Sequence, residues 1–211
     1  MCQISNHALT PILPHRVSVS QDGTLRITNV THRDTGHYTC RAENIFGTSA
    51  SSGNVYVKDV TEVELTPADL ELTVGESAVL TCRSRHDRTL HAHFLWSFDG
   101  QPINFQREGG HFEKMRAQVS SADVMIRNIQ LQHSGRYGCR VRTAVDSSSG
   151  TAVVLVRGPP GAPGVVIVEE MSSHTATLSW SPSQDHQSPV TRYNLQARSP
   201  YTLGWQSVTT G

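Results

Sequence analysis

One stretch of the sequence occurs twice. LRITNVTHRDTGHYTCR, which starts at Leu25, returns without a gap as VMIRNIQLQHSGRYGCR, which starts 99 residues later at Val124. Both copies end in the pattern Gly-x-Tyr-x-Cys-Arg. The offset is too long for a helical or leucine-rich repeat and matches one antiparallel sandwich domain of about 100 residues. The sequence therefore predicts a tandem array of β domains.

Strand signals run through the chain, and sustained helical periodicity is absent. VELTPADLELTVGESAVLTC, from Val63, alternates apolar and polar residues and is interrupted at Thr66-Pro67. Phe94, Trp96 and Phe98 share one parity, so in a strand they face the same way. Alternation of this kind, punctuated by turn residues, is typical of strands. We predict an all-β fold.

The segment 60–157 carries the full residue set of an immunoglobulin-like domain. Cys82 stands on an alternating strand, Trp96 follows 14 residues later, and Cys139 follows 57 residues after Cys82. Tyr137, two residues before the second cysteine, fits a tyrosine corner. A Cys82–Cys139 disulfide packed on Trp96 is predicted, which implies an oxidising compartment. The alternative is a pair of buried free thiols, as in intracellular domains of the same fold.

The first copy of the repeat has no such upstream half. Tyr38 and Cys40 match the second copy, yet no strand with a cysteine and no tryptophan precede them. We interpret residues 1–59 as the C-terminal half of an immunoglobulin-like domain, with 1–14 unassigned. Because Cys2 lies in a stretch without alternation, a bond between Cys2 and Cys40 is not expected.

The two copies also differ in the turn before the tyrosine. Asp34 in the first copy is replaced by His133 in the second. A carboxylate can accept hydrogen bonds from turn amides. We expect the corner to hold less firmly where the imidazole replaces it.

The C-terminal part follows a change in composition. Residues 158–164 form a Pro/Gly-rich linker, which we expect to be a partly extended spacer. Residues 165–211 resemble the N-terminal part of a fibronectin type III domain that has no cysteines. Its core residues are expected to be Trp180 at the end of a strand and Tyr193 on the next strand, and Trp205 is expected on a following strand. The fold class is thus tandem immunoglobulin-like sandwiches followed by the start of a fibronectin type III sandwich.

Charge and motifs argue against several functions. Acidic and basic residues balance at 18 each, so no electrostatic footprint favours nucleic acid or an anionic membrane. No apolar run approaches the ~18 residues of a membrane-spanning helix. A nucleophile elbow, a zincin helix and a phosphate loop are all missing from the sequence. We therefore expect no enzymatic activity and no cofactor.

A histidine cluster raises the alternative of a metal site. His86, Asp87, His91 and His93 are close in sequence, and His111 could join them. A His-x-His pair on a strand projects both rings to one face. A polar loop without a metal is the preferred interpretation, because no third ligand or supporting partner is evident.

Asn29 begins the sequon Asn-Val-Thr, the acceptor for N-linked glycans in secreted proteins. Its counterpart Asn128 lacks a sequon and suggests a different role, a polar residue at a strand end. We favour a surface glycan on Asn29.

With these features in place, the chain resembles the contactin family of neuronal cell-surface adhesion glycoproteins. The resemblance rests on GPPGAPG, TATLSW, SPVTRYNLQARSP and GWQSV near the C-terminus and on ELTVGES and GGHFEKMRAQVSSADVMIRNI in the middle segment. It implies an extracellular protein held on the axon membrane by a glycosylphosphatidylinositol anchor. It also implies binding to cell-surface proteins in cis or trans, with effects on neurite outgrowth and synapse formation. This segment is expected to act as a spacer.

A second class of function uses the same modules. The ectodomain of a transmembrane receptor phosphatase or receptor kinase is also an array of immunoglobulin and fibronectin domains. The residues of this chain do not separate the two classes by physical argument, so both stay open at this stage.

Overall fold

The computed structural model describes residues 16–107, 110–115 and 117–210. Across these residues the regular structure is strand, apart from two three-residue 3-10 helices, η1 (His32–Asp34) and η2 (Leu131–His133). The prediction of an all-β fold is confirmed. The chain divides into two compact units, Met1–Val60 and Thr61–Gly211, which are treated separately below.

The described part of the first unit consists of two antiparallel hairpins. β1 (Val17–Val19) pairs with β2 (Leu25–Ile27), and β3 (Gly36–Asn44) pairs with β4 (Gly47–Val55). The helix η1 joins the two hairpins. A hollow of about 400 Å³ lies against both hairpins, and its lining includes Leu25, Tyr38 and Cys40. The predicted terminal stretch 1–14 lies outside the described residues.

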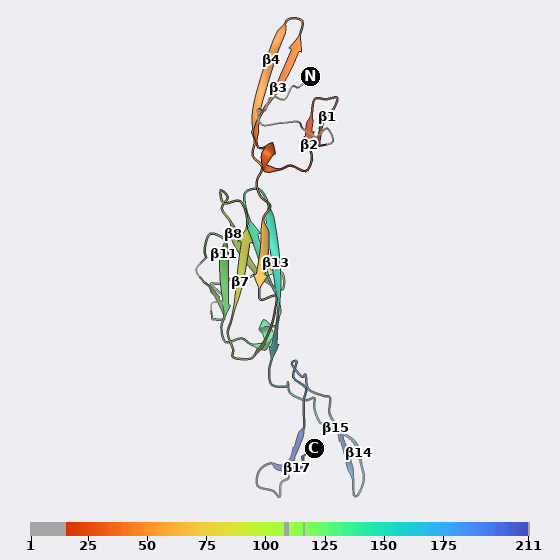
Figure 1. Cartoon of the computed structure of the whole chain (residues 1–211). Helices are drawn as coiled ribbons and strands as arrows, with labels where there is room; N and C mark the ends of the chain where they lie inside the picture. Colours follow the sequence, from red (N-terminus) through yellow and green to blue (C-terminus); the bar gives the residue numbers. More distant parts are fainter. Residues whose placement is uncertain (1–15, 108–109, 116, 211) are drawn as a thin grey trace. The chain divides into compact units, whose positions relative to one another are not determined.

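The middle sandwich is built from two sheets (Figure 1). The four-stranded sheet has the order β10-β11-β7-β5, and the five-stranded sheet has the order β6-β13-β12-β8-β9. The strands run as follows: β5 Glu62–Thr66, β6 Asp69–Thr73, β7 Ala78–Arg85, β8 His93–Phe98, β9 Gln101–Pro102, β10 Phe112–Lys114, β11 Ser121–Ile126, β12 Gly135–Arg142 and β13 Ser147–Arg157. All neighbours are antiparallel except β13 and β6, which run parallel.

The first strand segment of the sandwich passes from one sheet to the other at Pro67. β5 is hydrogen-bonded to β7 in one sheet, whereas β6, which follows at once, is hydrogen-bonded to β13 in the other. Proline removes a backbone donor and so interrupts a ladder. The break that the sequence shows at Thr66-Pro67 therefore lets one segment close both sheets.

The core lies between the two sheets and is made by the inward residues of alternating strands. Leu80, Val124 and Ile126 come from the four-stranded sheet, and Val141 and Val154 from the five-stranded sheet; all five are fully buried. Fully burying such a side chain contributes about 1.5–3 kcal/mol, so this layer is the main source of stability for the sandwich.

The corresponding positions of the first unit are less covered. Val30 is 52% exposed, whereas its counterpart Ile129 has no exposed surface. Leu25 and Ile27 are half-buried, whereas Val124 and Ile126 are fully buried. In the described part of the first unit, the same sequence pattern therefore gives less complete burial than in the middle sandwich.

The C-terminal segment contains two hairpin-like pairs. β14 (Ile167–Met171) pairs with β15 (Ala176–Ser179), and β16 (Asn194–Ala197) pairs with β17 (Gln206–Thr210). The predicted linker contacts this segment, because the amides of Gly161 and Gly164 donate to the carbonyls of Gln184 and Ser181 at 2.9 and 3.0 Å. A Cβ on Gly164 would collide with Ser181, so glycine is required for this close approach.

Candidate functional site

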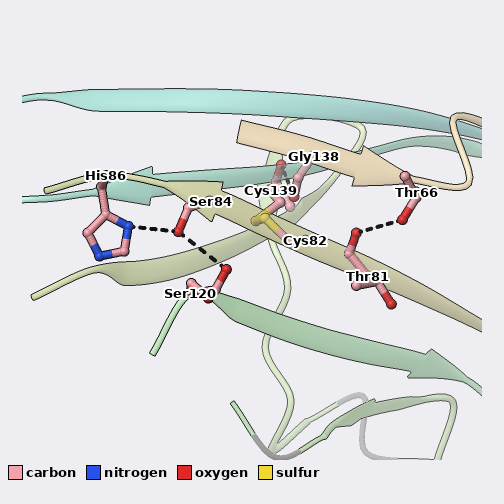
Figure 2. The surroundings of a disulfide bond; sticks show 9 residues. Thr66, Thr81, Cys82, Ser84, His86, Ser120, Gly138 and Cys139 are labelled. Atoms are coloured by element: carbon pink, nitrogen blue, oxygen red, sulfur yellow. Dashed lines mark hydrogen bonds between the residues drawn. A yellow bond between two sulfur atoms is a disulfide. The ribbon is translucent and has the colours of Figure 1, made fainter. Parts of the chain in front are cut away.

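A disulfide joins the two sheets of the middle sandwich (Figure 2). Cys82 on β7 and Cys139 on β12 are bonded with a Cα–Cα distance of 6.2 Å, and both are fully buried. Trp96 lies directly opposite Cys139 in the β8–β12 register and is 4% exposed. The structure thus brings together the cysteine pair and the tryptophan that the sequence singles out.

A polar group accompanies the disulfide on β7. The Ser84 hydroxyl lies 3.0 Å from His86 Nδ1 and 3.4 Å from the Ser120 carbonyl oxygen, as Figure 2 shows. Ser84 itself is buried. This contact satisfies a buried hydroxyl and positions the His86 ring at the end of the strand.

Cys40 behaves differently from the sequence prediction. It is disulfide-bonded, so the expectation that it lacks a bonding partner is wrong. Cys2, the thiol considered for it, lies outside the described residues.

The tyrosine corner is present in both copies of the repeat. The Tyr137 hydroxyl donates to the His133 carbonyl at 2.9 Å, and the Tyr38 hydroxyl donates to the Asp34 carbonyl at 2.7 Å. In each case the bond ties the strand to the last residue of the preceding 3-10 helix and fixes the turn between them.

His133 replaces Asp34 more completely than the sequence predicts. The Thr31 amide donates to Asp34 Oδ2 at 2.6 Å, and the Gln130 amide donates to His133 Nδ1 at 2.9 Å. The imidazole nitrogen therefore accepts the same turn hydrogen bond as the carboxylate. A neutral imidazole carries one acceptor nitrogen, which supplies this bond, and the expectation that the corner holds less firmly stays a prediction.

The surroundings of His133 favour the neutral ring. His133 is only 5% exposed, and burial lowers its pKa, helped by the nearby His111. The His111 ring lies 4.6 Å from it between centroids, and the Phe112 ring meets it edge-on at 5.5 Å. Burial disfavours the charged form of a base, so Nδ1 stays available as an acceptor.

Asp34 in the first unit is held by charge as well. Its carboxylate accepts from Arg16 at 2.5 Å in addition to the Thr31 amide. These contacts, the amide first, lower the pKa of Asp34. Sequence reasoning missed Arg16, because nothing in the pattern links a residue 18 positions upstream to this turn.

Asn29 and Asn128 share an unusual backbone. Their φ angles are +49° and +45°, in the left-handed region that asparagine tolerates better than most residues. Both follow a strand that ends two residues earlier, β2 at Ile27 and β11 at Ile126. The two copies of the repeat therefore share this backbone conformation. Apart from the asparagine itself, nothing in the sequence indicates it.

The aromatic residues of the C-terminal segment flank its strands. Trp180 follows β15 directly, Tyr193 precedes β16 and Trp205 precedes β17, so each lies one position outside the observed strand rather than within it as predicted. The Trp180 and Tyr193 rings pack edge-on at 6.0 Å, and the Tyr193 hydroxyl accepts from the Ser183 amide at 3.1 Å. Trp205 lies apart from this pair, with the Arg198 guanidinium 5.6 Å above its ring.

The histidines considered for a metal do not converge in the described part of the chain. His86 contacts Ser84, and His111 contacts His133 and the Arg127 carbonyl. No group of three or more His, Cys, Asp or Glu residues suited to a metal ion occurs within residues 16–107, 110–115 and 117–210. The same ranges contain no helix with the length and apolar character needed to cross a bilayer.

One carboxylate that the sequence did not single out organises the start of the sandwich. Asp146 accepts from the Thr61 amide at 2.7 Å and from the Thr61 and Thr143 hydroxyls, each at 2.6 Å. Both threonines are buried, and these bonds, that of Thr143 first, lower the pKa of Asp146. Asp146 thus fixes the entry of the chain to the β12–β13 turn.

Two family models match the chain. The immunoglobulin domain model matches residues 68–151, and the immunoglobulin I-set domain model matches residues 5–57. The prediction of tandem immunoglobulin-like domains is confirmed. The interpretation of residues 165–211 as the start of a fibronectin type III domain stays a prediction.

Two solved structures show the same fold at low sequence identity. The N-terminal eight Ig domains of Down Syndrome Cell Adhesion Molecule isoform 1.30.30 give a TM-score of 0.58 at 22% identity, covering 81% of this chain and 22% of that one. Drosophila OTK extracellular domains 3-5 give a TM-score of 0.53 at 23% identity, covering 69% of this chain and 47% of that one.

Sequence relatives are more informative about identity. Contactin-5 of Rattus norvegicus is 59% identical over 195 residues, and Contactin-5 of Gallus gallus is 58% identical. Contactin-4 of Homo sapiens is 52% identical over the same length. Each match covers 92% of this chain, whereas the chain spans only 18–19% of the relatives' own length. The chain belongs to the contactin family.

Proposed function

We propose that this chain forms part of a neuronal cell-surface adhesion protein that acts by binding other cell-surface proteins, in cis or in trans, and without catalysis. The observation that carries the proposal is the match to Contactin-5 across 92% of the chain, together with tandem immunoglobulin domains. The same match makes a receptor phosphatase or receptor kinase ectodomain the less favoured reading. The expected biological outcomes are neurite outgrowth and synapse formation.

The buried disulfide supports an extracellular setting. The bond links Cys82 to Cys139 across a sequence separation of 57 residues. In the chain-entropy account, closing a loop of this length stabilises the folded state by about 4 kcal/mol. Bonds of this kind persist in oxidising compartments. The proposal places the protein outside the cell, held on the membrane through a glycosylphosphatidylinositol anchor. Release of the intact protein from neurons by phosphatidylinositol-specific phospholipase C would support the anchor, and resistance to the enzyme would contradict it.

Within that protein we assign the middle sandwich the role of a spacer. A rigid module that sets reach changes the effective concentration of a binding site at a cell junction without changing its intrinsic affinity. Serial modules with closed cores, such as the one between β5 and β13, are suited to this role.

A graft tests the spacer role. Residues 16–211 would replace the matching segment of rat Contactin-5, and a second graft would lack residues 60–157. The proposal predicts equal affinity of both soluble ectodomains for a partner and different adhesion between cells that carry them. If soluble affinity collapses while the other domains stay folded, the middle sandwich itself carries a binding surface and the spacer role is wrong.

We also propose that Asn29 carries an N-linked glycan. Asn29 is exposed and begins the sequon completed by Thr31. Glycosidase treatment of secreted protein should lower its apparent mass, and Asn29→Gly should abolish the change, because glycine keeps the left-handed backbone while removing the acceptor. Thr31→Ser is the matched control, since it preserves the sequon. An unchanged mass in the parent protein would contradict the assignment.

A further inference from the structure

The arginines on β12 form a row on the outer face of the five-stranded sheet. Arg136, Arg140 and Arg142 are exposed and point away from the core, because they alternate with the buried residues of the same strand. We call these three residues the arginine row. Within the described ranges, none of them forms an ion pair with a carboxylate.

The opposite sheet handles its arginines differently. On β7, Arg83 lies directly across from Glu64, and Arg85 directly across from Glu62, in the β5–β7 register. Opposite charges placed across a strand pair offset each other. The arginines of β7 are therefore balanced by glutamates of β5. Arginines without a carboxylate partner are thus found on β12 and not on both sheets of the sandwich.

The residues beside Arg140 and Arg142 carry no carboxylate, whereas Arg136 at the other end of the row lies beside Asp99, whose carboxylate accepts from the Arg136 amide at 2.8 Å. Arg140 lies between Leu95 on β8 and Ser149 on β13, and Arg142 lies between His93 and Ser147. The Arg140 guanidinium donates to the Ser147 hydroxyl at 2.9 Å. Neither flanking strand supplies an outward carboxylate beside these two arginines, so their charge is open to solvent and sterically uncovered.

An open hollow of about 280 Å³ continues the row at its end. Arg142 lines it together with His91 and His93, and the rest of its lining is uncharged. Two carboxylates contact threonines of this lining through neutral donors and offset part of the Arg142 charge: Asp87 accepts from Thr89, and Asp146 accepts from Thr143 as well as from Thr61. The hollow therefore adds cationic and imidazole donors to the same surface.

We propose that the arginine row and this hollow bind a sulfated glycosaminoglycan chain. A guanidinium presents several donors in a planar fork that matches the oxygens of a sulfate or carboxylate. A polyanionic chain can follow charges spaced along a strand, and it requires hydroxyl neighbours rather than an apolar surface.

The composition of the face favours a glycan over a protein partner. Centres of protein interfaces are depleted of serine and of most charged side chains, with arginine the exception, so the serines are what sets this face apart. This face instead carries Arg140, Arg142, Ser147 and Ser149, and Leu95, 54% exposed, is the apolar residue among them. The arginine row and the hollow thus offer polar and cationic groups suited to sugars and sulfates. Binding of a glycosaminoglycan would extend the proposed adhesive function to the extracellular matrix, and this proposal does not depend on that function.

Binding of heparin dodecasaccharide to the secreted 211-residue chain tests the proposal. Titration calorimetry at 0.1 M NaCl should show binding that weakens as salt rises, since exposed ionic contacts are screened. Arg140→Ser with Arg142→Ser should weaken it by about tenfold, through loss of two charge-assisted contacts. Arg83→Ser with Arg85→Ser is the matched control, because it removes the same charge from the other sheet and should change affinity by less than about twofold.

Each other outcome overturns the assignment. Absence of heparin binding by the parent chain would do so, as would an equal loss in both double variants, which would indicate a response to net charge alone. Desulfated heparin and poly-L-glutamate separate the possible sources of the anion. If either binds as tightly as heparin, the face does not recognise a sulfated glycan. Circular dichroism of both variants should match the parent, because all four arginines are exposed.

Discussion

The backbone amide of Gln130 donates a hydrogen bond to Nδ1 of His133 across 2.9 Å. This contact takes the place of the carboxylate bond made by Asp34 in the first unit, where the Thr31 amide is the donor. A protonated imidazole has no acceptor nitrogen, so the turn of the middle sandwich depends on a neutral ring. The turn of the first unit depends instead on an ionised carboxylate.

This difference predicts that the middle sandwich is sensitive to mild acid. Burial and His111 lower the pKa of His133, so just below the ordinary histidine value of about 6.5 the folded chain binds fewer protons than the unfolded chain. The contribution of His133 to the free energy of unfolding should therefore be fully present above about pH 6.5, and it should be lost as the pH drops below that value. Urea unfolding from pH 7.5 to 5, followed by hydrogen exchange in β11 and β12, measures this.

His133→Asp should remove that dependence. The new carboxylate can accept the Gln130 amide while ionised, so its contribution should persist down to about pH 4, where an ordinary carboxyl protonates. His93→Gln, which changes an exposed histidine on β8, is the control and should leave the parent profile unchanged. A parent profile that is flat between pH 7 and 5 would contradict the role of His133.

The two tyrosine corners should differ in their contribution to stability. Tyr137→Phe removes a buried donor from the His133 carbonyl and should lower the unfolding free energy of the middle sandwich by about 1–2 kcal/mol. Tyr38→Phe removes the matching bond in the first unit, where the tyrosine is only half-buried, and should cost less. Hydrogen exchange in each unit measures the two losses of unfolding free energy. Equal losses for the two variants would contradict the claim that burial determines how much each tyrosine bond contributes.

Asp146 should be a point of vulnerability at the start of the sandwich. Asp146→Ala would leave the buried Thr61 hydroxyl without its acceptor and the Thr143 hydroxyl with only the backbone carbonyl of residue 146, at 3.3 Å, and should cost about 2 kcal/mol. Asp146→Asn retains one oxygen acceptor and should cost less. Asp22→Asn, at an exposed turn of the first unit, serves as the control. Equal midpoints for the alanine variant and the parent in urea would contradict the role of Asp146.

Short, regular patterns let the sequence predict much of the middle sandwich. The alternation around Leu80 and Cys82, and the spacing of Trp96 and Cys139, reflect the two-residue period of strands and the position of the core. The interruption at Thr66-Pro67 was also visible in the sequence, because the lack of an amide donor is a local property of proline, whereas the change of sheet at this point came from the structure.

Features that depend on contacts between distant residues could not be predicted in this way. Asp146 and Thr61 are 85 positions apart, and Arg16 and Asp34 are 18 apart, so no local period connects them. The arginine row required the register of β12 with both neighbours, since only the register shows which residues flank each guanidinium. The acceptor role of His133 was missed for a chemical reason, because only the carboxylate was considered as an acceptor, although a neutral imidazole also carries one acceptor nitrogen.

The state of Cys82 and Cys139 in secreted material tests the central claim most directly, that this chain is an extracellular immunoglobulin module. The 211-residue chain would be expressed through a secretory pathway, alkylated without reduction, digested and analysed by mass spectrometry. The account predicts a peptide containing Cys82 linked to a peptide containing Cys139, in material whose middle sandwich is protected from exchange. Alkylation of both thiols in such folded material, or a bond from Cys82 to Cys40, would contradict it.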